Sequence, residues 1–187
     1  MKKIIGVSGT NGAGKDTFSN YVTRRTNGMQ VGLGHLLRDQ LPVHIPSTRQ
    51  NLALLSAKLR EEHGLAVLVD FAISKFRASE SENLVVNGIR HPAEAERIKE
   101  IGGFMLWIDA PVSLRYQRIT ENDRNRIEDQ VSFEEFRTQE LREMTSSSES
   151  SVNLTAVKSL ADLAIVNSYD NQGEFEAEID ELFFRGE

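Results

Sequence analysis

The segment from Gly9 to Thr17 reads GTNGAGKDT and directly follows the apolar run Ile4-Ile5-Gly6-Val7. A strand, a glycine-rich turn and a helix in this order are typical of a phosphate-binding loop, or P-loop. Its glycines allow the backbone to curl so that successive N–H groups point inward, and the helix adds the positive end of its dipole. The segment therefore predicts a polyphosphate site in which Lys15 reaches the β- and γ-phosphates. The candidate ATP contacts are Gly9, Asn11, Gly12, Ala13, Gly14, Lys15, Asp16 and Thr17.

The position after the lysine departs from the usual P-loop pattern. A Ser or Thr normally follows the lysine and binds Mg²⁺ through its hydroxyl, but this chain has Asp16 there and Thr17 one position later. Asp16 could bind the metal through water, or it could simply favour the helix N-terminus as a negative charge. The sequence leaves both interpretations open, so Asp16 and Thr17 are the candidate Mg²⁺ ligands.

Composition narrows the class of protein. The 187 residues are 39% apolar and 27% charged, which is typical of one globular domain with a well-buried core. A net charge of −6 argues against a nucleic-acid polymer as partner and favours small anionic ligands in a local basic pocket. The chain has no cysteine, which excludes disulfides and thiolate zinc sites. It has no stretch long enough to span a membrane and no recognisable signal peptide, so we expect a cytoplasmic protein without a membrane partner.

Strand and helix signals alternate along the chain, which predicts an α/β fold with a five-stranded parallel sheet in three α/β/α layers. We expect one domain over residues 1–187, with insertions at about 42–80 and 121–150. Two capping boxes, Ser47 with Gln50 and Ser132 with Glu135, predict helix starts. The expected strands are 3–8, 29–33, 83–87, 104–109 and 161–167. The expected helices include 14–25, 36–41, 65–78, 132–144, 153–158 and 174–184, and two that begin near Pro92 and Pro111.

Ligands of parallel sheets bind at the carboxyl ends of the strands, and two of these ends carry an arginine. Arg38 follows the second strand, and Arg90 follows the third, where Gly88 permits close approach of a ligand. An arginine at either place can bind a phosphate with two parallel hydrogen bonds, although each could also be a solvated surface residue. Asn87 stands where P-loop proteins usually have an acid that holds Mg²⁺ through water.

A charge-dense segment from Glu121 to Gln130 has no apolar period and predicts a mobile loop. Arginines on such a loop can close over transferring phosphates and neutralise developing charge. Alternatively, they form a solvated face in which they pair with neighbouring acids. The arginines in and before this segment are Arg115, Arg118, Arg124 and Arg126.

Together these segments resemble the nucleoside monophosphate kinase branch of the P-loop kinases. They are most similar to a family of nucleotide kinases related to dephospho-CoA kinase. The resemblance covers nearly the whole chain, with His35 and Asn87 standing where the family has acids. Besides the P-loop, the segments that carry the resemblance are Gly34-His35-Leu36-Leu37-Arg38, Val86-Asn87-Gly88-Ile89-Arg90 and Ala164-Ile165-Val166-Asn167.

The resemblance implies a kinase that moves the γ-phosphoryl group of ATP, with Mg²⁺, to a nucleotide-like acceptor. That acceptor is a nucleoside or deoxynucleoside monophosphate, or a molecule like dephospho-CoA. The resemblance also implies that the insertion at about 42–80 helps to bind the acceptor and that the region at about 121–150 is a lid. The implied acceptor residues are Arg38, Gly88 and Arg90. The implied catalytic residues are Lys15, Arg118, Arg124 and Arg126, and Asn167 lies near the adenine.

The alternative is a regulatory P-loop NTPase that binds and slowly hydrolyses ATP without a small acceptor. The two missing acids favour this alternative, whereas the two acceptor arginines favour the kinase.

If the kinase acts on a hydroxyl acceptor, it would need a carboxylate base, for which Asp16 is the nearest candidate by sequence.

Overall fold

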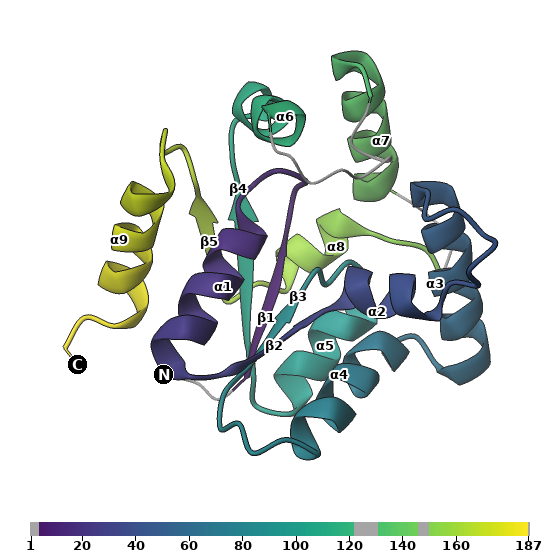
Figure 1. Ribbon diagram of the computed structural model, residues 1–187, viewed down its shortest axis with the longest axis horizontal. Helices are drawn as coiled ribbons and strands as arrows, with labels where there is room; N and C mark the ends of the chain where they lie inside the picture. The colour runs from purple at the N-terminus through teal and green to yellow at the C-terminus, as the bar shows by residue number, and fades with distance from the viewer. Residues whose placement is uncertain (1–3, 122–130, 146–149, 187) are drawn as a thin grey trace.

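The computed structural model describes residues 4–121, 131–145 and 150–186. Its five strands form one parallel sheet in the order β2-β3-β1-β4-β5 (Figure 1). The predicted α/β fold with a five-stranded parallel sheet is therefore confirmed. The strands are β1 Ile4–Gly9, β2 Met29–Gly32, β3 Leu84–Asn87, β4 Phe104–Asp109 and β5 Leu163–Val166.

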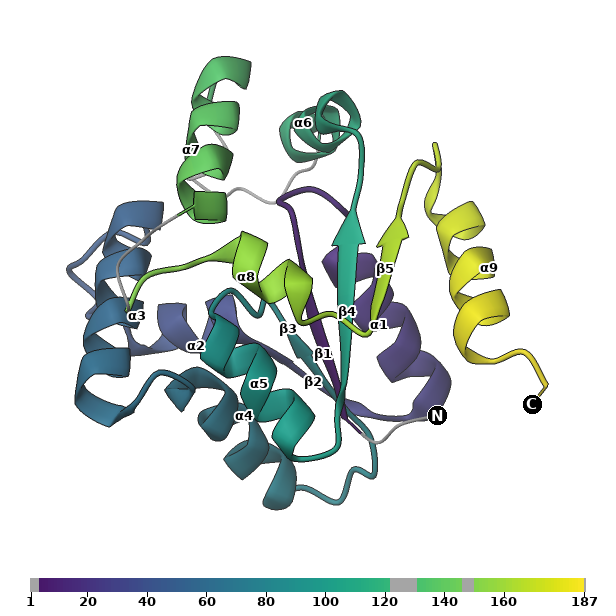
Figure 2. The same cartoon turned by 180° about the vertical axis from the view of Figure 1, so that it is seen from behind.

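Helices cover both faces of the sheet. On one face, α1 (Lys15–Thr26) and α9 (Gln172–Phe183) bury side chains such as Phe18 and Phe175 against Ile5. On the other face lie α5 (Pro92–Glu100) and α8 (Leu154–Ser159). Figure 2 shows α5 and α8 in front of the sheet and α1 behind it. Alternate residues of each buried strand thus face two separate cores, as a three-layer fold requires.

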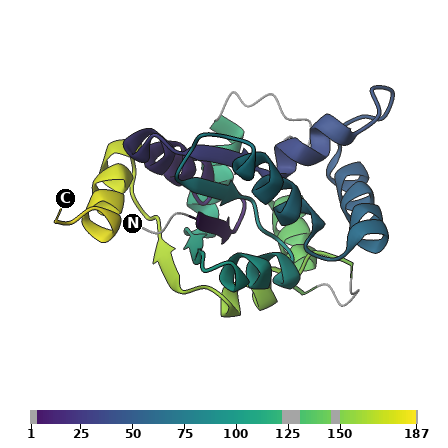
Figure 3. The ribbon, with the colours of Figure 1, turned by 90° about the horizontal axis from the view of Figure 1, so that it is seen from below.

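The remaining helices lie at the carboxyl ends of the strands and on the side of the sheet that carries β2. Figure 2 shows α6 and α7 beyond the carboxyl ends of the strands, and Figure 3 shows α3 and α9 at opposite ends of the molecule. The first insertion therefore lies beside β2 and far from α9. Helix α2 (Leu33–Gln40) precedes this insertion, whose helices are α3 (Arg49–His63) and α4 (Val67–Arg77). Helices α6 and α7 span Val112–Glu121 and Phe133–Thr145.

Two helix starts differ from the expected ones. Helix α2 begins at Leu33, directly after β2, because Leu33, Leu36 and Leu37 share one buried helical face. The predicted capping box at Ser47 was wrong, since the N-cap of α3 is Thr48, whose hydroxyl accepts the backbone N–H of Asn51 at 3.2 Å. The box at Ser132 was confirmed by reciprocal hydrogen bonds with Glu135, of 2.8 and 3.3 Å.

Most of the predicted charged loop lies outside the described residues, and so do Arg124 and Arg126. Within residues 4–121, 131–145 and 150–186, no helix is both long enough and apolar enough to cross a bilayer.

Candidate functional site

The loop between β1 and α1 has the curled backbone that its glycines predict. Gly9, Gly12 and Gly14 have φ angles of 143°, 79° and 100°, a region that side chains disfavour. A Cβ atom at Gly9 would lie 1.9 Å from the backbone oxygen of Ile108, and one at Gly12 would lie 2.5 Å from that of Arg115. The loop is therefore pressed against β4 and α6 so closely that only glycine fits.

Lys15 and Asn167 contact this loop. The Lys15 ammonium donates a hydrogen bond to the Thr10 carbonyl at 2.6 Å, which keeps the charge at the loop. The buried Asn167 side chain, just after β5, donates from Nδ2 to the Ala13 carbonyl at 3.0 Å. Its Nδ2 would also lie 2.4 Å from a Cβ atom at Gly14. Asn167 thus supports the loop directly.

Arg118 lies beside Asn167 rather than in the cavity described below. It donates to the Tyr169 carbonyl at 2.7 Å, to the Asn167 carbonyl at 3.3 Å and to Asn167 Oδ1 at 3.2 Å. Burial lowers the pKa of Arg118 from its usual value, partly offset by Asp170. In this structure Arg118 therefore holds the segment after β5.

Arg115 is buried and connects the P-loop to α7 through hydrogen bonds. It donates to the Ala110 carbonyl at 2.8 Å and to the Asn11 carbonyl at 3.3 Å. Its two terminal nitrogens also bind both carboxylate oxygens of Glu140. The charge-dense sequence around Arg115 predicted a lid or a solvated face, but the Arg115 side chain is only 4% exposed.

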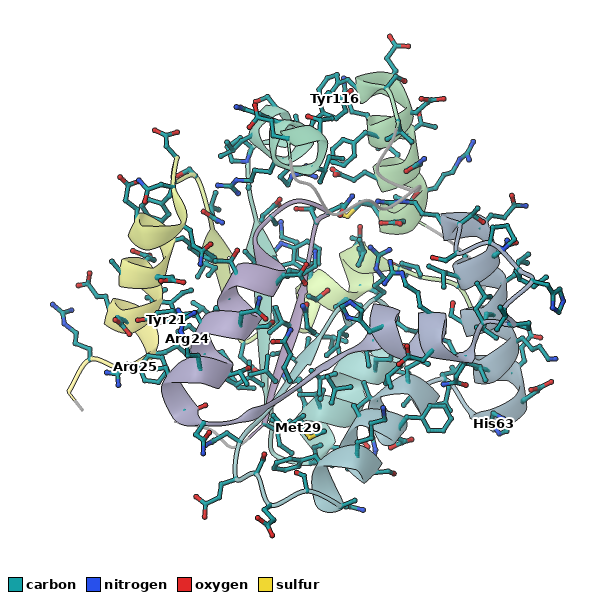
Figure 4. All side chains as sticks on the ribbon, viewed as in Figure 1. Tyr21, Arg24, Arg25, Met29, His63 and Tyr116 are labelled. Atoms are coloured by element: carbon teal, nitrogen blue, oxygen red, sulfur yellow. The ribbon has the colours of Figure 1, made fainter. Side chains whose placement is uncertain are left out.

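Aromatic packing adds a second link between α6 and α7. Figure 4 shows Tyr116 between these two helices. Its ring centroid lies 5.2 Å from that of Phe133 and 5.8 Å from that of Phe136, and its hydroxyl donates to the Val131 carbonyl at 3.1 Å. These contacts fix α7 beside the P-loop, where Glu140 binds Arg115 and Glu143 lines the cavity.

Asp16 and Asn87 meet at the end of β3. Asn87 Nδ2 donates to Asp16 Oδ1 at 2.6 Å, whereas the buried Asn87 Oδ1 has no hydrogen-bond partner among the described residues. A carboxylate on the P-loop helix thus faces an amide on the strand. In the usual P-loop pattern the helix carries a hydroxyl and the strand carries the carboxylate. Thr17 lies in the first turn of α1 and is not among the residues that line the cavity.

A cavity of about 380 Å³ opens beside the P-loop. The residues that line it include Lys15 and Asp16 of the P-loop together with Arg38, Gly88 and Arg90. The structure therefore brings the predicted donor and acceptor residues to one cavity. Further polar residues that line it, which sequence reasoning missed, are Arg49, Ser56, Arg60, Glu94, Arg142, Glu143 and Ser151.

Glu94 fixes the turn that carries Arg90. Its Oε2 atom accepts the backbone N–H groups of Arg90 at 3.0 Å and of His91 at 3.1 Å. Its Oε1 atom accepts Arg60 Nη2 at 2.8 Å, in a pair whose side chains are 2% and 0% exposed. A glutamate three residues after a helix cap is a recognisable sequence signal, and it could have identified Glu94.

Arg90 and Arg49 share one carboxylate from α7. Glu143 Oε1 lies 2.7 Å from Arg90 Nη1 and 3.0 Å from Arg49 Nη1. Burial raises the pKa of Glu143, but Arg90 and Arg49 lower it more, so the pKa lies below its usual value. Glu143 in turn raises the pKa of Arg90. Both groups are therefore charged at neutral pH.

Comparison with known proteins identifies the family of this chain. A family model described as an AAA domain, AAA_18, matches residues 5–147. The UPF0200 protein of Hyperthermus butylicus is 32% identical over 185 residues, which cover 97% of this chain and 94% of the relative.

Solved structures of low sequence identity share the fold. The shikimate kinase from Acinetobacter baumannii, in complex with shikimate, aligns with a TM-score of 0.61 and 17% identity over 97% of this chain and 93% of its own. The enzyme from Bacteroides thetaiotaomicron aligns with a TM-score of 0.62 and 14% identity over 97% and 98%. The fold is therefore that of the small P-loop kinases. By its matches the chain belongs to the AAA_18 family of AAA domains and to the UPF0200 proteins, and its P-loop implies nucleotide binding.

Proposed function

We propose that this protein is an ATP- and Mg²⁺-dependent phosphotransferase that acts on a small, nucleotide-like anionic acceptor. One observation carries the proposal: Lys15 of the P-loop and the acceptor candidates Arg38 and Arg90 line the same cavity. A donor phosphate on the loop would face an acceptor held by these arginines. Such a shared cavity suits direct transfer between two bound molecules better than hydrolysis alone.

The chemistry would depend on positioning and charge. Loop N–H groups and Lys15 would hold the β- and γ-phosphates, and Arg38 and Arg90 would orient the acceptor. An acceptor oxygen forms a bond to the γ-phosphorus while the bond to the β–γ bridging oxygen breaks, and ADP leaves with that oxygen. A phosphate acceptor needs no general base because its oxygen is already ionised. For a hydroxyl acceptor, Asp16 is a carboxylate that lines the cavity.

The residues at the end of β3 fit an Mg²⁺ ion that arrives with ATP. Among the described residues, no group of three or more His, Asp or Glu side chains forms a metal cage. Mg²⁺ in nucleotide sites needs none, since it keeps several waters and uses one or two carboxylates plus phosphate oxygens. Asp16 would supply the carboxylate, and the unpartnered Asn87 Oδ1 could accept a hydrogen bond from a metal-bound water. When bound, the ion would neutralise charge on the β- and γ-phosphate oxygens.

We predict that Asp16→Asn raises the Mg²⁺ concentration needed for half-maximal turnover by about 10-fold or more. Asparagine keeps the size of the side chain and an oxygen that can accept from Asn87, but it loses the negative charge. The measurement is ADP release against Mg²⁺ concentration at saturating ATP. The matched control is Asp39→Asn, on an exposed residue of α2, which should leave the curve unchanged. An unaltered Mg²⁺ dependence in Asp16→Asn would show that Asp16 serves only the helix N-terminus.

The function is tested by coupled ADP-release assays with a panel of acceptors. The panel holds nucleoside and deoxynucleoside monophosphates, dephospho-CoA and shikimate. Release that requires one acceptor, with that acceptor recovered phosphorylated, supports the proposal. Slow release that no acceptor stimulates contradicts it and favours the regulatory NTPase.

The regulatory alternative has specific observations in its favour. Asn87 replaces the usual acid, and Glu143 forms an ion pair with Arg90, which is a candidate acceptor residue.

Arg124 and Arg126 remain candidate catalytic residues from sequence alone. In the proposed kinase, Arg118 would act from beside Asn167, at the donor side of the site.

A further inference from the structure

Three elements that are distant in sequence converge on a single carboxylate oxygen. Arg49 is the first residue of α3, Arg90 follows β3, and Glu143 lies near the end of α7. Both guanidinium groups contact the same atom, Glu143 Oε1, at 3.0 and 2.7 Å. One anionic oxygen between two arginines is also the arrangement in which a ligand carboxylate or phosphate would bind.

This ion-pair group lines the cavity with partly exposed side chains, whereas the nearby pair of Arg60 with Glu94 also lines it but is buried. The side chains of Glu143, Arg49 and Arg90 are 19%, 24% and 32% exposed, whereas those of Arg60 and Glu94 are 2% and 0% exposed. Glu94 also holds two backbone N–H groups, so its removal would disrupt the turn. Among the described residues, the printed partners of the Glu143 carboxylate are the side chains of Arg49 and Arg90. Glu143 can therefore be replaced by another anion without a backbone rearrangement.

Several arginines line the cavity, whereas His35 is the aromatic side chain among its described lining residues. Among the described residues that line it there is no Phe, Tyr or Trp on which a ring could stack. Its apolar lining is aliphatic and includes Leu37, Leu52 and Leu68. An acceptor would therefore be recognised here mainly through its anionic group.

We propose that Arg49 and Arg90 form one subsite for a carboxylate or phosphate group of the acceptor, and that Glu143 occupies this subsite until the acceptor displaces it. The inference rests on the proposed function, because it takes the ligand to be the phosphoryl acceptor. It adds Arg49 as a residue that determines specificity. It also makes Glu143 an internal competitor that weakens acceptor binding.

The test removes the competing charge and measures anion binding. Inorganic phosphate and malonate are titrated separately, by calorimetry, into the full chain saturated with Mg²⁺ and a non-hydrolysable ATP analogue. The analogue fills the P-loop, so the titrated anion reports the second site. In Glu143→Gln at least one of the two anions should bind about 10-fold more tightly than in the wild type. A gain for phosphate alone identifies a phosphate subsite, and a gain for malonate alone identifies a carboxylate subsite.

Two controls separate the subsite from general charge effects. Glu134→Gln makes the same change on an exposed residue of α7 and should leave both affinities unchanged. Adding Arg49→Ala to Glu143→Gln should abolish the gain. Glu143→Ala provides a second neutral variant if the glutamine variant proves unstable in a thermal melt.

The inference is overturned if both neutral variants fold and neither anion binds more tightly. It is also overturned if the gain survives Arg49→Ala. Binding of the ATP analogue, measured in the same samples, distinguishes this failure from that of the proposed function. If the ATP analogue binds but the Glu143 variants show unchanged anion affinity, only the subsite is overturned. If the wild type does not bind the analogue at all, the proposed function itself is contradicted.

Discussion

Replacing Lys15 with alanine should weaken ATP binding by roughly 10- to 150-fold and lower kcat/KM by about 1000-fold or more. The binding loss corresponds to one charge-assisted contact, about 1.5–3 kcal/mol. The further loss in turnover is expected because the ammonium would stabilise charge that develops on the transferring phosphoryl group. The Lys15 ammonium already lies 2.6 Å from the Thr10 carbonyl, so its removal takes away a charge held at the loop.

Calorimetry with an ATP analogue and the coupled assay give the two readouts for Lys15→Ala. The control is Lys58→Ala, a lysine of α3 whose side chain is 68% exposed and pairs with Glu62 in its own helix. That variant should match the wild type in both assays. If Lys15→Ala also binds the analogue normally, the Gly9–Thr17 segment does not hold phosphate and the proposed function fails.

The parts of the site that the sequence predicted are local or follow from strand topology. The curled loop at Gly9, Gly12 and Gly14 needs only its own glycines and the flanking apolar run. Arg38 and Arg90 each follow a strand, and parallel strands bring their carboxyl ends to one edge. The cavity therefore contains both arginines as expected.

The parts that the sequence did not predict depend on how helices pack. Arg49 and Glu143 lie on different helices, and no local pattern relates them. Arg115 has the appearance of a surface arginine in a charged stretch, yet Glu140 and the loop carbonyls enclose it. Burial of a charge becomes favourable only where partners surround it, and a single sequence does not place those partners.

The change of residue type at positions 16 and 87 can be predicted from the sequence only in part. The sequence shows that Asp16 replaces a hydroxyl and that Asn87 replaces an acid. Only the structure relates the two changes, because Asn87 Nδ2 donates to Asp16 Oδ1 at 2.6 Å. One carboxylate and one neutral polar group thus still meet at the end of β3, but the charge lies on the helix instead of the strand. This pairing favours Asp16 as a metal ligand over a purely local role at the helix N-terminus.

Arg90→Ala should lower kcat/KM for the acceptor by about 100-fold and leave ATP binding within about 2-fold of the wild type. The side chain would contribute a charged contact to the acceptor, whereas Glu94 holds the backbone N–H of Arg90 and would still fix the turn. Arg38→Ala should act in the same direction, because Arg38 lines the acceptor side of the cavity.

The control for both acceptor variants is Arg77→Ala, an exposed arginine at the end of α4, which should have no effect. Initial rates at varied acceptor and saturating ATP give kcat/KM, and calorimetry with the ATP analogue gives donor affinity. Donor affinity is the decisive readout. Misfolding would reduce both kcat/KM for the acceptor and the affinity for the ATP analogue, whereas loss of a specific acceptor contact reduces only kcat/KM. If Arg38→Ala and Arg90→Ala instead lose ATP affinity, these arginines belong to the donor site. The cavity would then hold a single nucleotide rather than two substrates, which would favour the regulatory NTPase over the kinase.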